Sequence, residues 1–296
     1  MFLMLRDSFL DYLRFERNYS EATVVSYGID LTQFEDFIKS VDEELTVEEV
    51  DSDLIRQWEI SLMEKGYTST SVNRKLSTLR SFYRFLLIRG KVEKDPVRKV
   101  TGPKNKKPLP SFLKEEEMNR LIDETDFGQG FIGCRDKMII EMFYATGMRR
   151  SELIGLNDVD VDFPASLVKV TGKRNKQRLI PFADELRQSM EEYIKVRNEE
   201  VSDRCEAFFV NKNGKRLYDN EVYNLVKRNL SKVVTLKKRS PHVLRHTFAT
   251  TMLNNEAGLE SVKELLGHSS LSATEVYTHA TFEELKKVYK QAHPRA

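Results

Sequence analysis

A proline-rich, basic stretch about one third of the way along the chain limits the possible folds more than any other feature. Four of the eight prolines fall within fifteen residues: Pro96, Pro103, Pro108 and Pro110. No acidic residue occurs between Asp95 and Glu115. Because proline lacks the N–H that helices and central strands need, the stretch cannot be regular structure. We therefore expect an extended linker at 96–110 between a domain at 1–95 and a second at 111–296.

The composition narrows the class of protein. The chain has 296 residues, of which 40% are hydrophobic and 32% charged; this is too apolar for a disordered chain, and no apolar run approaches the ~18 residues of a membrane span. Residues 1–6 lack the pattern of a secretion signal. Two cysteines are too few for a disulfide framework or a cysteine-based metal site. We expect a cytoplasmic protein that does not associate with membranes.

Charge is distributed unevenly along the chain. Residues 1–98 hold 14 Lys and Arg against 18 Asp and Glu, whereas residues 99–296 hold 34 against 28. Within the acidic first part, seven basic residues but no acidic one lie between Glu64 and Glu93. Blocks of one sign indicate a polyanionic partner, with a solvated helix face as the alternative.

The first domain is expected to be entirely helical. Apolar residues recur at helical spacing over 5–15 and 20–40, over 46–66 after a capping box at Thr46, and over 69–89. The last of these helices has an apolar stripe and a second stripe of arginines and serines, which suits a helix lying against DNA. Together with the linker, it predicts DNA contacts by Arg74, Lys75, Arg80, Arg84, Lys104, Lys106 and Lys107.

The second domain is expected to combine helices with a small sheet. A helical pattern over 141–156 contains a glycine break, and the β-type runs 166–170 and 178–182 are separated by a turn, which predicts a hairpin. Residues 207–210 could form a third strand. From residue 220 onward the pattern is helical again.

The histidines gather near the C-terminus. Ser240 and Pro241 form a good N-cap and first-turn pair, so His242 and Arg245 would share one face of a helix beside free N–H groups, where phosphate binds readily. His242 also lies four residues before another histidine, as in helical zinc pairs. However, Val243 stands where a zinc protease has its catalytic glutamate, so we expect no metal.

Five separated motifs stand in a characteristic order. They are TGMRRSEL at 146–153, GKRNKQRLIP at 172–181, PHVLRHTFA at 241–249, LLGHSS at 265–270 and VYTH at 276–279. In order and spacing they resemble the catalytic motifs of tyrosine recombinases (phage integrases), most closely the bacterial Xer type, and the tail AHPRA at 292–296 is similar to Xer tails. Arg174 stands where the family's hairpin often has a glycine, which leaves Lys173 in place.

The resemblance implies metal-free, ATP-independent cleavage and rejoining of DNA through a 3′-phosphotyrosine. The implied catalytic residues are Arg149, Lys173, His242, Arg245, His268 and Tyr277. The tyrosine would attack phosphorus while the two arginines hold the non-bridging oxygens. The lysine would protonate the leaving 5′-oxygen, His242 would exchange the tyrosine proton, and His268 would hydrogen-bond the scissile phosphate. No cofactor is implied.

The resemblance also implies an architecture and partners. The fold would be mostly α with a small β-sheet: a C-shaped DNA clamp made of an all-helical core-binding (SAM-like) domain and an α+β catalytic domain. The implied partners are double-stranded DNA carrying a dif-like site, further subunits in a homotetramer or in a hetero-tetramer with a Xer paralogue, and a septal DNA translocase. The segment after Tyr277 carries an apolar stripe of Phe282, Leu285, Val288 and Tyr289. It would either dock on a neighbouring subunit or close over its own core.

The expected role is the resolution of chromosome dimers during segregation, but three other functions stay open. An integrase of a mobile element would use the same chemistry on another substrate. A type IB topoisomerase would relax DNA without pairing two sites. A DNA-binding protein with a vestigial site is the third alternative, and the intact set of six catalytic residues argues against it.

Overall fold

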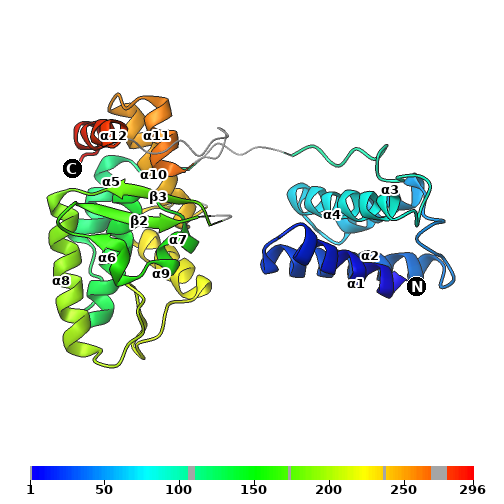
Figure 1. Ribbon diagram of the computed structural model, residues 1–296, viewed down its shortest axis with the longest axis horizontal. Coiled ribbons are helices and arrows are strands. Elements are labelled where there is room, and N and C mark those ends of the chain that lie inside the picture. The colour runs from blue at the N-terminus through cyan, green and yellow to red at the C-terminus, as the bar shows by residue number, and fades with distance from the viewer. Residues whose placement is uncertain (1, 106–110, 173–174, 236–237, 268–278) are drawn as a thin grey trace. The chain divides into compact units, whose positions relative to one another are not determined.

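The computed structural model describes residues 2–105, 111–172, 175–235, 238–267 and 279–296, with side chains described from residue 285 onward in the last helix. The chain divides into two compact units, Met1–Pro108 and Leu109–Ala296, and each is described by itself (Figure 1). No helix among the described residues combines the length and the apolar character that crossing a bilayer requires.

The first unit is helical, as predicted. Its helices are α1 (Phe2–Asp11), which continues as a π-helical turn (Tyr12–Glu16), α2 (Glu21–Val41), α3 (Ser52–Glu64) and α4 (Ser69–Ile88). The capping pair at Thr46 exists, since the Glu49 carboxylate accepts the Thr46 N–H at 3.0 Å, but it closes a turn. Helix α3 begins only at Ser52, where the Asp51 carboxylate accepts the N–H groups of the first turn.

The core of the first unit forms around α4. The predicted apolar stripe of this helix, Leu76, Leu79, Tyr83 and Leu86, is fully buried. Against it pack residues of α1, α2 and α3, including an edge-to-face pair of Phe34 and Trp58 whose ring centroids lie 4.9 Å apart. The helical spacing of apolar residues therefore placed this core correctly.

The first part of the predicted linker belongs to this unit. Val97 and Val100 are buried in its core, and the carbonyl of Val100 accepts a hydrogen bond from Arg80 at 2.9 Å. The side chain of Asn73 donates to the carbonyl of Pro103 at 2.8 Å. Proline excludes regular structure but does not prevent packing, so the expected boundary at residue 95 lies too early.

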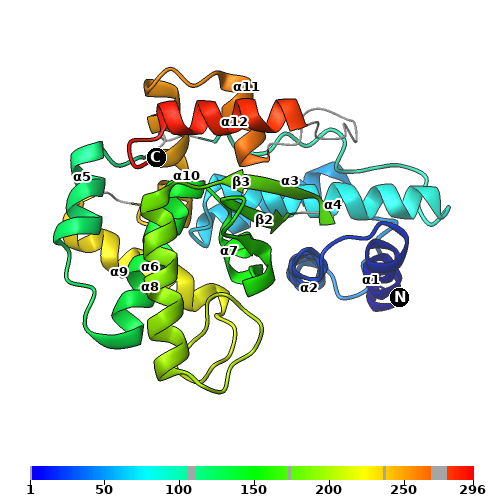
Figure 2. The same cartoon turned by 60° about the vertical axis from the view of Figure 1, so that its left-hand side comes forward.

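The second unit is mixed. Its elements are α5 (Glu115–Asn119) with a π-helical turn (Arg120–Glu124), α6 (Gly130–Thr146), α7 (Arg150–Gly155), a short 3-10 turn (Asp158–Asp160), β1 (Val161–Asp162), β2 (Leu167–Thr171), β3 (Gln177–Pro181), α8 (Asp184–Glu200), α9 (Asp219–Val233), α10 (Pro241–Asn254), α11 (Leu259–Leu266) and α12 (His279–Ala292). Helix α6 is the most buried element and packs between α8 and α10 (Figure 2).

The sheet is antiparallel in the order β1-β2-β3, and the predicted hairpin pairs Val168 with Ile180 and Val170 with Arg178. The prediction of a strand at 207–210 is wrong. Its residues are buried in succession without alternation, and only the isolated bridges of Ala207 and Val210 are formed. The segment fills the core, and the short β1 is the third strand.

The end of the chain packs on its own unit. Leu285, Tyr289 and Ala292 lie in one cluster with Phe248 of α10. The ring of His293 stacks on Tyr289 with centroids 5.2 Å apart, and burial lowers its pKa to about 4. In the part of the chain that the structure describes, the tail therefore packs on the core of its own unit. Phe282 lies outside the described side chains.

Candidate active site

A glycine loop brings the first arginine motif to the surface. Helix α6 ends at Gly147, whose φ of +58° is in the left-handed region. A Cβ at this position would lie 2.5 Å from the ring of Phe248 and 2.9 Å from Leu266, so only glycine fits. The turn ends the predicted 141–156 helix, and α7 begins directly after Arg149.

Arg245 reaches this loop from α10, which begins at Pro241 as predicted. The guanidinium of Arg245 donates to the carbonyl of Gly147 at 2.6 Å and to that of Leu266 at 2.7 Å. His242 lies one turn earlier on the same helix. Burial, followed by the charge of Arg149, lowers the pKa of Arg245 to about 10, so it remains a cation at neutral pH.

Arg149 is held by a buried carboxylate. Its guanidinium donates to Glu152 at 2.8 Å and to the carbonyl of Gly267 at 3.0 Å, and the other oxygen of Glu152 accepts the Arg149 N–H at 2.7 Å. The Arg149 side chain remains 36% exposed. It is therefore fixed in direction while still accessible to a ligand.

Glu152 has a second arginine partner that the sequence did not single out. Arg178 of β3 forms a two-bond ion pair with both oxygens of Glu152, at 2.7 and 2.9 Å. Burial alone would raise the pKa of Glu152, but the hydrogen bonds and charge of Arg178, with those of Arg149, bring it to about 2. The available signal was the alternation of the strand Gln177–Pro181, which places Arg178 on the same buried face as Ile180.

Arg149 and Arg245 line a basic cavity of about 410 Å³. Its lining includes Arg149, Arg150, Lys227, Lys238, Arg239, His242 and Arg245, and none of its described lining residues is acidic. Burial, and then the charges of Arg245, Arg150 and Arg149, lower the pKa of His242. A neutral imidazole beside two fixed guanidinium groups can accept a proton next to a bound phosphate.

The structure thus brings together three of the six predicted catalytic residues: Arg149, His242 and Arg245. The other three, Lys173, His268 and Tyr277, lie outside the described residues. Among the described residues, no group of three or more His, Cys, Asp or Glu side chains is arranged to hold a metal ion.

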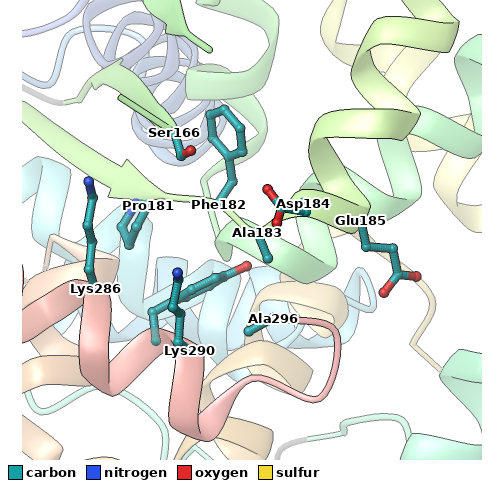
Figure 3. Close-up of a pocket in the computed structure, with 10 residues that line it drawn as sticks. Ser166, Pro181, Phe182, Ala183, Asp184, Glu185, Lys286, Lys290 and Ala296 are labelled. Carbon is teal, nitrogen blue, oxygen red and sulfur yellow. The ribbon is translucent and has the colours of Figure 1, made fainter. Parts of the chain in front are cut away.

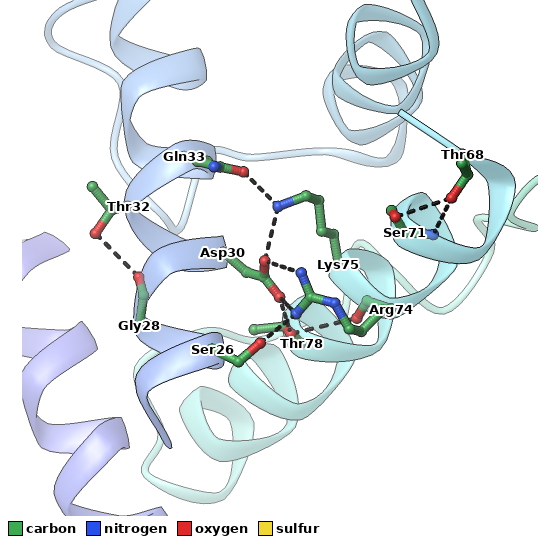
Figure 4. A network of polar contacts seen from close by, with 10 residues as sticks. All are labelled: Ser26, Gly28, Asp30, Thr32, Gln33, Thr68, Ser71, Arg74, Lys75 and Thr78. Atoms are coloured by element: carbon green, nitrogen blue, oxygen red, sulfur yellow. Dashed lines mark hydrogen bonds and ion pairs between the residues drawn. The ribbon is translucent and has the colours of Figure 1, made fainter. Parts of the chain in front are cut away.

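The predicted DNA contacts of the first unit differ in exposure. Figure 4 shows Arg74 and Lys75 of α4 converging on Asp30 of α2. Arg74 donates to Asp30 at 2.7 Å and to Ser26 at 2.6 Å, and its side chain is 46% exposed. Lys75 is 3% exposed and donates to Asp30 at 2.8 Å. This burial argues against the predicted DNA contact of Lys75, because its ammonium is bonded within the contact between two helices.

Of the remaining predicted contacts, Arg80, Arg84 and Lys104 are exposed, whereas Lys106 and Lys107 lie outside the described residues.

A separate cavity of about 340 Å³ lies between the end of β3, the start of α8 and α12 (Figure 3). Lys286 and Lys290 extend from α12 towards it, and Pro181 and Phe182 form its opposite side. Its described lining shares no residue with that of the basic cavity, so the two cavities are distinct.

Comparisons with known proteins agree with this geometry. The phage integrase family matches residues 111–284, and the phage integrase N-terminal SAM-like domain matches residues 7–90. Tyrosine recombinase XerC of Chlorobaculum tepidum is 38% identical over 97% of this chain and 94% of its own. Tyrosine recombinase XerC of Staphylococcus carnosus is 39% identical over 99% and 98%.

Solved structures share the fold. XerH site-specific recombinase bound to a palindromic difH substrate superposes with a TM-score of 0.72 at 22% identity, covering 92% of this chain and 80% of that one. The Tn1549 transposon integrase in complex with transposon right end DNA gives 0.75 at 18% identity, covering 97% and 98%.

The chain belongs to the phage integrase, or tyrosine recombinase, family. It is an Xer-type site-specific recombinase, an enzyme class that cuts and rejoins DNA through a phosphotyrosine intermediate. The predicted fold class, mostly helical with a small sheet and two domains, is confirmed.

Proposed function

We propose that this recombinase resolves chromosome dimers at a dif-like site, by the chemistry that its residues allow. The observation that carries the proposal is the pair of guanidinium groups of Arg149 and Arg245, which donate to the adjacent carbonyls of Gly267 and Leu266 and lie beside His242 in a basic cavity. Planar guanidinium groups suit the non-bridging oxygens of a phosphodiester.

In this proposal Tyr277 attacks the scissile phosphorus and remains bonded to the 3′-phosphate, while the P–O bond to the 5′-oxygen breaks. Lys173 gives a proton to that oxygen, and His242 takes the proton of the tyrosine. His268 donates a hydrogen bond to the phosphate. Reversal with a 5′-hydroxyl from another strand completes the exchange and conserves the bond energy, so ATP is not required.

We further propose that the enzyme works as a tetramer on double-stranded DNA, homomeric or with a Xer paralogue, and that a septal DNA translocase controls it. The names of the curated relatives support the Xer assignment over that of a mobile-element integrase. Arg74, Arg80, Arg84 and the linker lysines would contact the DNA backbone. The proposal places the enzyme with the chromosome, in the cytoplasm.

A nicked suicide duplex carrying a dif-like site from the source chromosome tests the chemistry. After incubation, a denaturing gel should show a protein–DNA adduct with the wild type and none with Tyr277→Phe. An adduct that persists in the Tyr277→Phe variant would contradict the assignment of the nucleophile. Absence of both binding and adduct would contradict the recombinase proposal for this site.

A further inference from the structure

Three arginines cap one helix end. The last carbonyls of a helix have no partner within it, and they carry partial negative charge. At the end of α11, Arg178 donates to the carbonyl of Leu265 at 2.8 Å and Arg245 to that of Leu266 at 2.7 Å. Arg149 donates to the carbonyl of Gly267 at 3.0 Å. The point from which the chain leads to His268 and Tyr277 is therefore fixed by cations from β3, α10 and the start of α7.

Arg178 differs from Arg149 and Arg245 because it does not line the basic cavity. Its side chain is 7% exposed, against 36% for Arg149. Nε is used by Leu265, and both terminal nitrogens are used by Glu152. Its contacts therefore serve the protein alone.

The close approach of Arg178 to the helix end also depends on Gly267. This glycine has φ +63°, and a Cβ there would lie 3.1 Å from Cδ and Nη1 of Arg178. The carbonyl of the same glycine accepts the bond from Arg149. Arg178, Glu152, Arg149 and Gly267 thus form a closed chain of contacts, in which moving one member moves the next.

We propose that Arg178 is a positioning residue of the active site: by joining Glu152 to the carbonyl of Leu265, it fixes the guanidinium of Arg149 relative to the end of α11. The inference rests on the proposed role of Arg149 in holding the scissile phosphate. Arg178 comes from the hairpin strand β3, and its bonds tie the sheet to the first arginine motif, at Glu152, and to the end of α11, at Leu265.

The test compares Arg178→Met with Arg197→Met. Arg197 is an equally buried arginine of the same unit, with a two-bond ion pair to Asp158 and a bond to the carbonyl of Phe208, and it takes no part in the basic cavity. Cleavage of the suicide duplex should be about 100-fold slower per bound molecule in Arg178→Met, since a misplaced catalytic group costs about that much. DNA affinity should stay near that of the wild type. Arg197→Met should cleave at the wild-type rate once bound.

Arg178→Lys keeps the charge against Glu152 but loses the planar fork, and it covers the case in which Arg178→Met does not fold. It should melt close to the wild type and cleave about 10-fold more slowly, because one nitrogen cannot reach the carbonyl of Leu265 and both oxygens of Glu152 with the geometry of the guanidinium. Wild-type cleavage by Arg178→Met would overturn the proposal. If Arg178→Met does not fold, wild-type cleavage by Arg178→Lys would overturn it.

Arg178 could instead act through Lys173, since β3 follows the hairpin turn. A suicide duplex with sulfur in place of the 5′-bridging oxygen separates the two routes, because a thiolate leaves without a proton donor. Arg178→Met should remain slow on this substrate, whereas Lys173→Ala should recover. Recovery of Arg178→Met would overturn the assignment to Arg149.

A crystal structure of Arg178→Lys gives a readout that does not depend on the DNA site. The contact between Arg149 and the carbonyl of Gly267 should be lost or lengthened. If that contact is unchanged, the positioning role is wrong. If the contact is lost but the wild type forms no adduct on any dif-like DNA, it is the proposed function that fails.

Discussion

The two units of this recombinase share one electrostatic arrangement. In the first, Asp30 is fully buried and shared between Lys75, which is buried, and Arg74, which is half-exposed. In the second, Glu152 is buried and shared between Arg178 and the half-exposed Arg149. Each cluster thus has one more cation than anion, and the excess belongs to an arginine at the surface. A carboxylate that is out of water holds such an arginine in one direction, which prepares it for a phosphate.

The clusters differ in what they connect. All the cationic partners of Asp30 lie on α4, so its cluster is a contact between two helices. The cluster of Glu152 joins α7, β3 and the end of α11, which are far apart in the sequence. The first arrangement therefore presents a contact residue, whereas the second assembles a site.

Removal of the two carboxylates is expected to have the largest effect. Asp30→Ala and Glu152→Ala should each lower the free energy of unfolding by about 3–5 kcal/mol, because each leaves buried cations unpaired. Folded Asp30→Ala should still form the DNA adduct, while folded Glu152→Ala should not. Denaturant unfolding with a parallel adduct assay checks this. Equal adduct formation by the two variants at the same folded fraction would refute the distinction.

Loss of either arginine of the basic cavity, Arg149 or Arg245, should have the next largest effect. Arg149→Ala or Arg245→Ala should cost about 3 kcal/mol of transition-state stabilisation, or a rate more than 100-fold lower, by analogy with the loss of an oxyanion donor. Single-turnover cleavage of the suicide duplex measures it, with gel-shift affinity as the control. Near-wild-type cleavage by either variant would refute the phosphate clamp.

Acid should remove the contribution of the Glu152 cluster to the stability of the protein. Its carboxyl has a pKa of about 2 when folded, against 4.5 for an ordinary glutamate, so its contribution is complete above 4.5 and is lost as the pH falls towards 2. That difference corresponds to about 3 kcal/mol. The free energy of unfolding should therefore fall more steeply between pH 5 and 3 in the wild type than in Glu152→Gln. Parallel curves for the two proteins would contradict the shift.

The salt dependence of DNA binding separates the two cations on Asp30. Arg74→Ala should make the slope of log K against log salt less negative by about 0.9, the value for one neutralised phosphate. Lys75→Met should leave the slope unchanged, since the ammonium is buried. Titrations of a dif-like duplex at several salt concentrations decide this. If both variants change the slope equally, Lys75 reaches the DNA after all.

The smallest effect concerns proton transfer. Burial and the charges of Arg245, Arg150 and Arg149 lower the pKa of His242, so cleavage should decline only below pH 6.5, as the ring becomes protonated. Arg150→Met removes one of those charges and should move the acid limb of the rate profile to higher pH. Lys212→Met, at an exposed lysine outside the cavity lining, is the matched control. An unmoved limb in Arg150→Met would refute this coupling.

Local signals in the sequence predicted the helix ends and turns, because these depend on residues that are neighbours in the sequence. The break at Gly147, the start of α10 at Pro241 and the hairpin of β2 and β3 all follow from turn, cap and alternation rules. Arg74 and Lys75 are adjacent and chemically alike, and only the packing of α2 decides that the lysine is the buried one. Arg178 was missed because its partners lie 26 and 87 residues away.

The packing of the segment after residue 95 has a practical consequence for domain exchange between recombinases. A chimera joined at 95 would replace Val97 and Val100, and with them part of the buried core of the first unit. Each buried valine contributes about 1.5–3 kcal/mol to the free energy of unfolding. The first unit of such a hybrid would therefore be less stable. A junction placed after Pro103, beyond the hydrogen bond from Asn73, keeps both valines with the core in which they evolved.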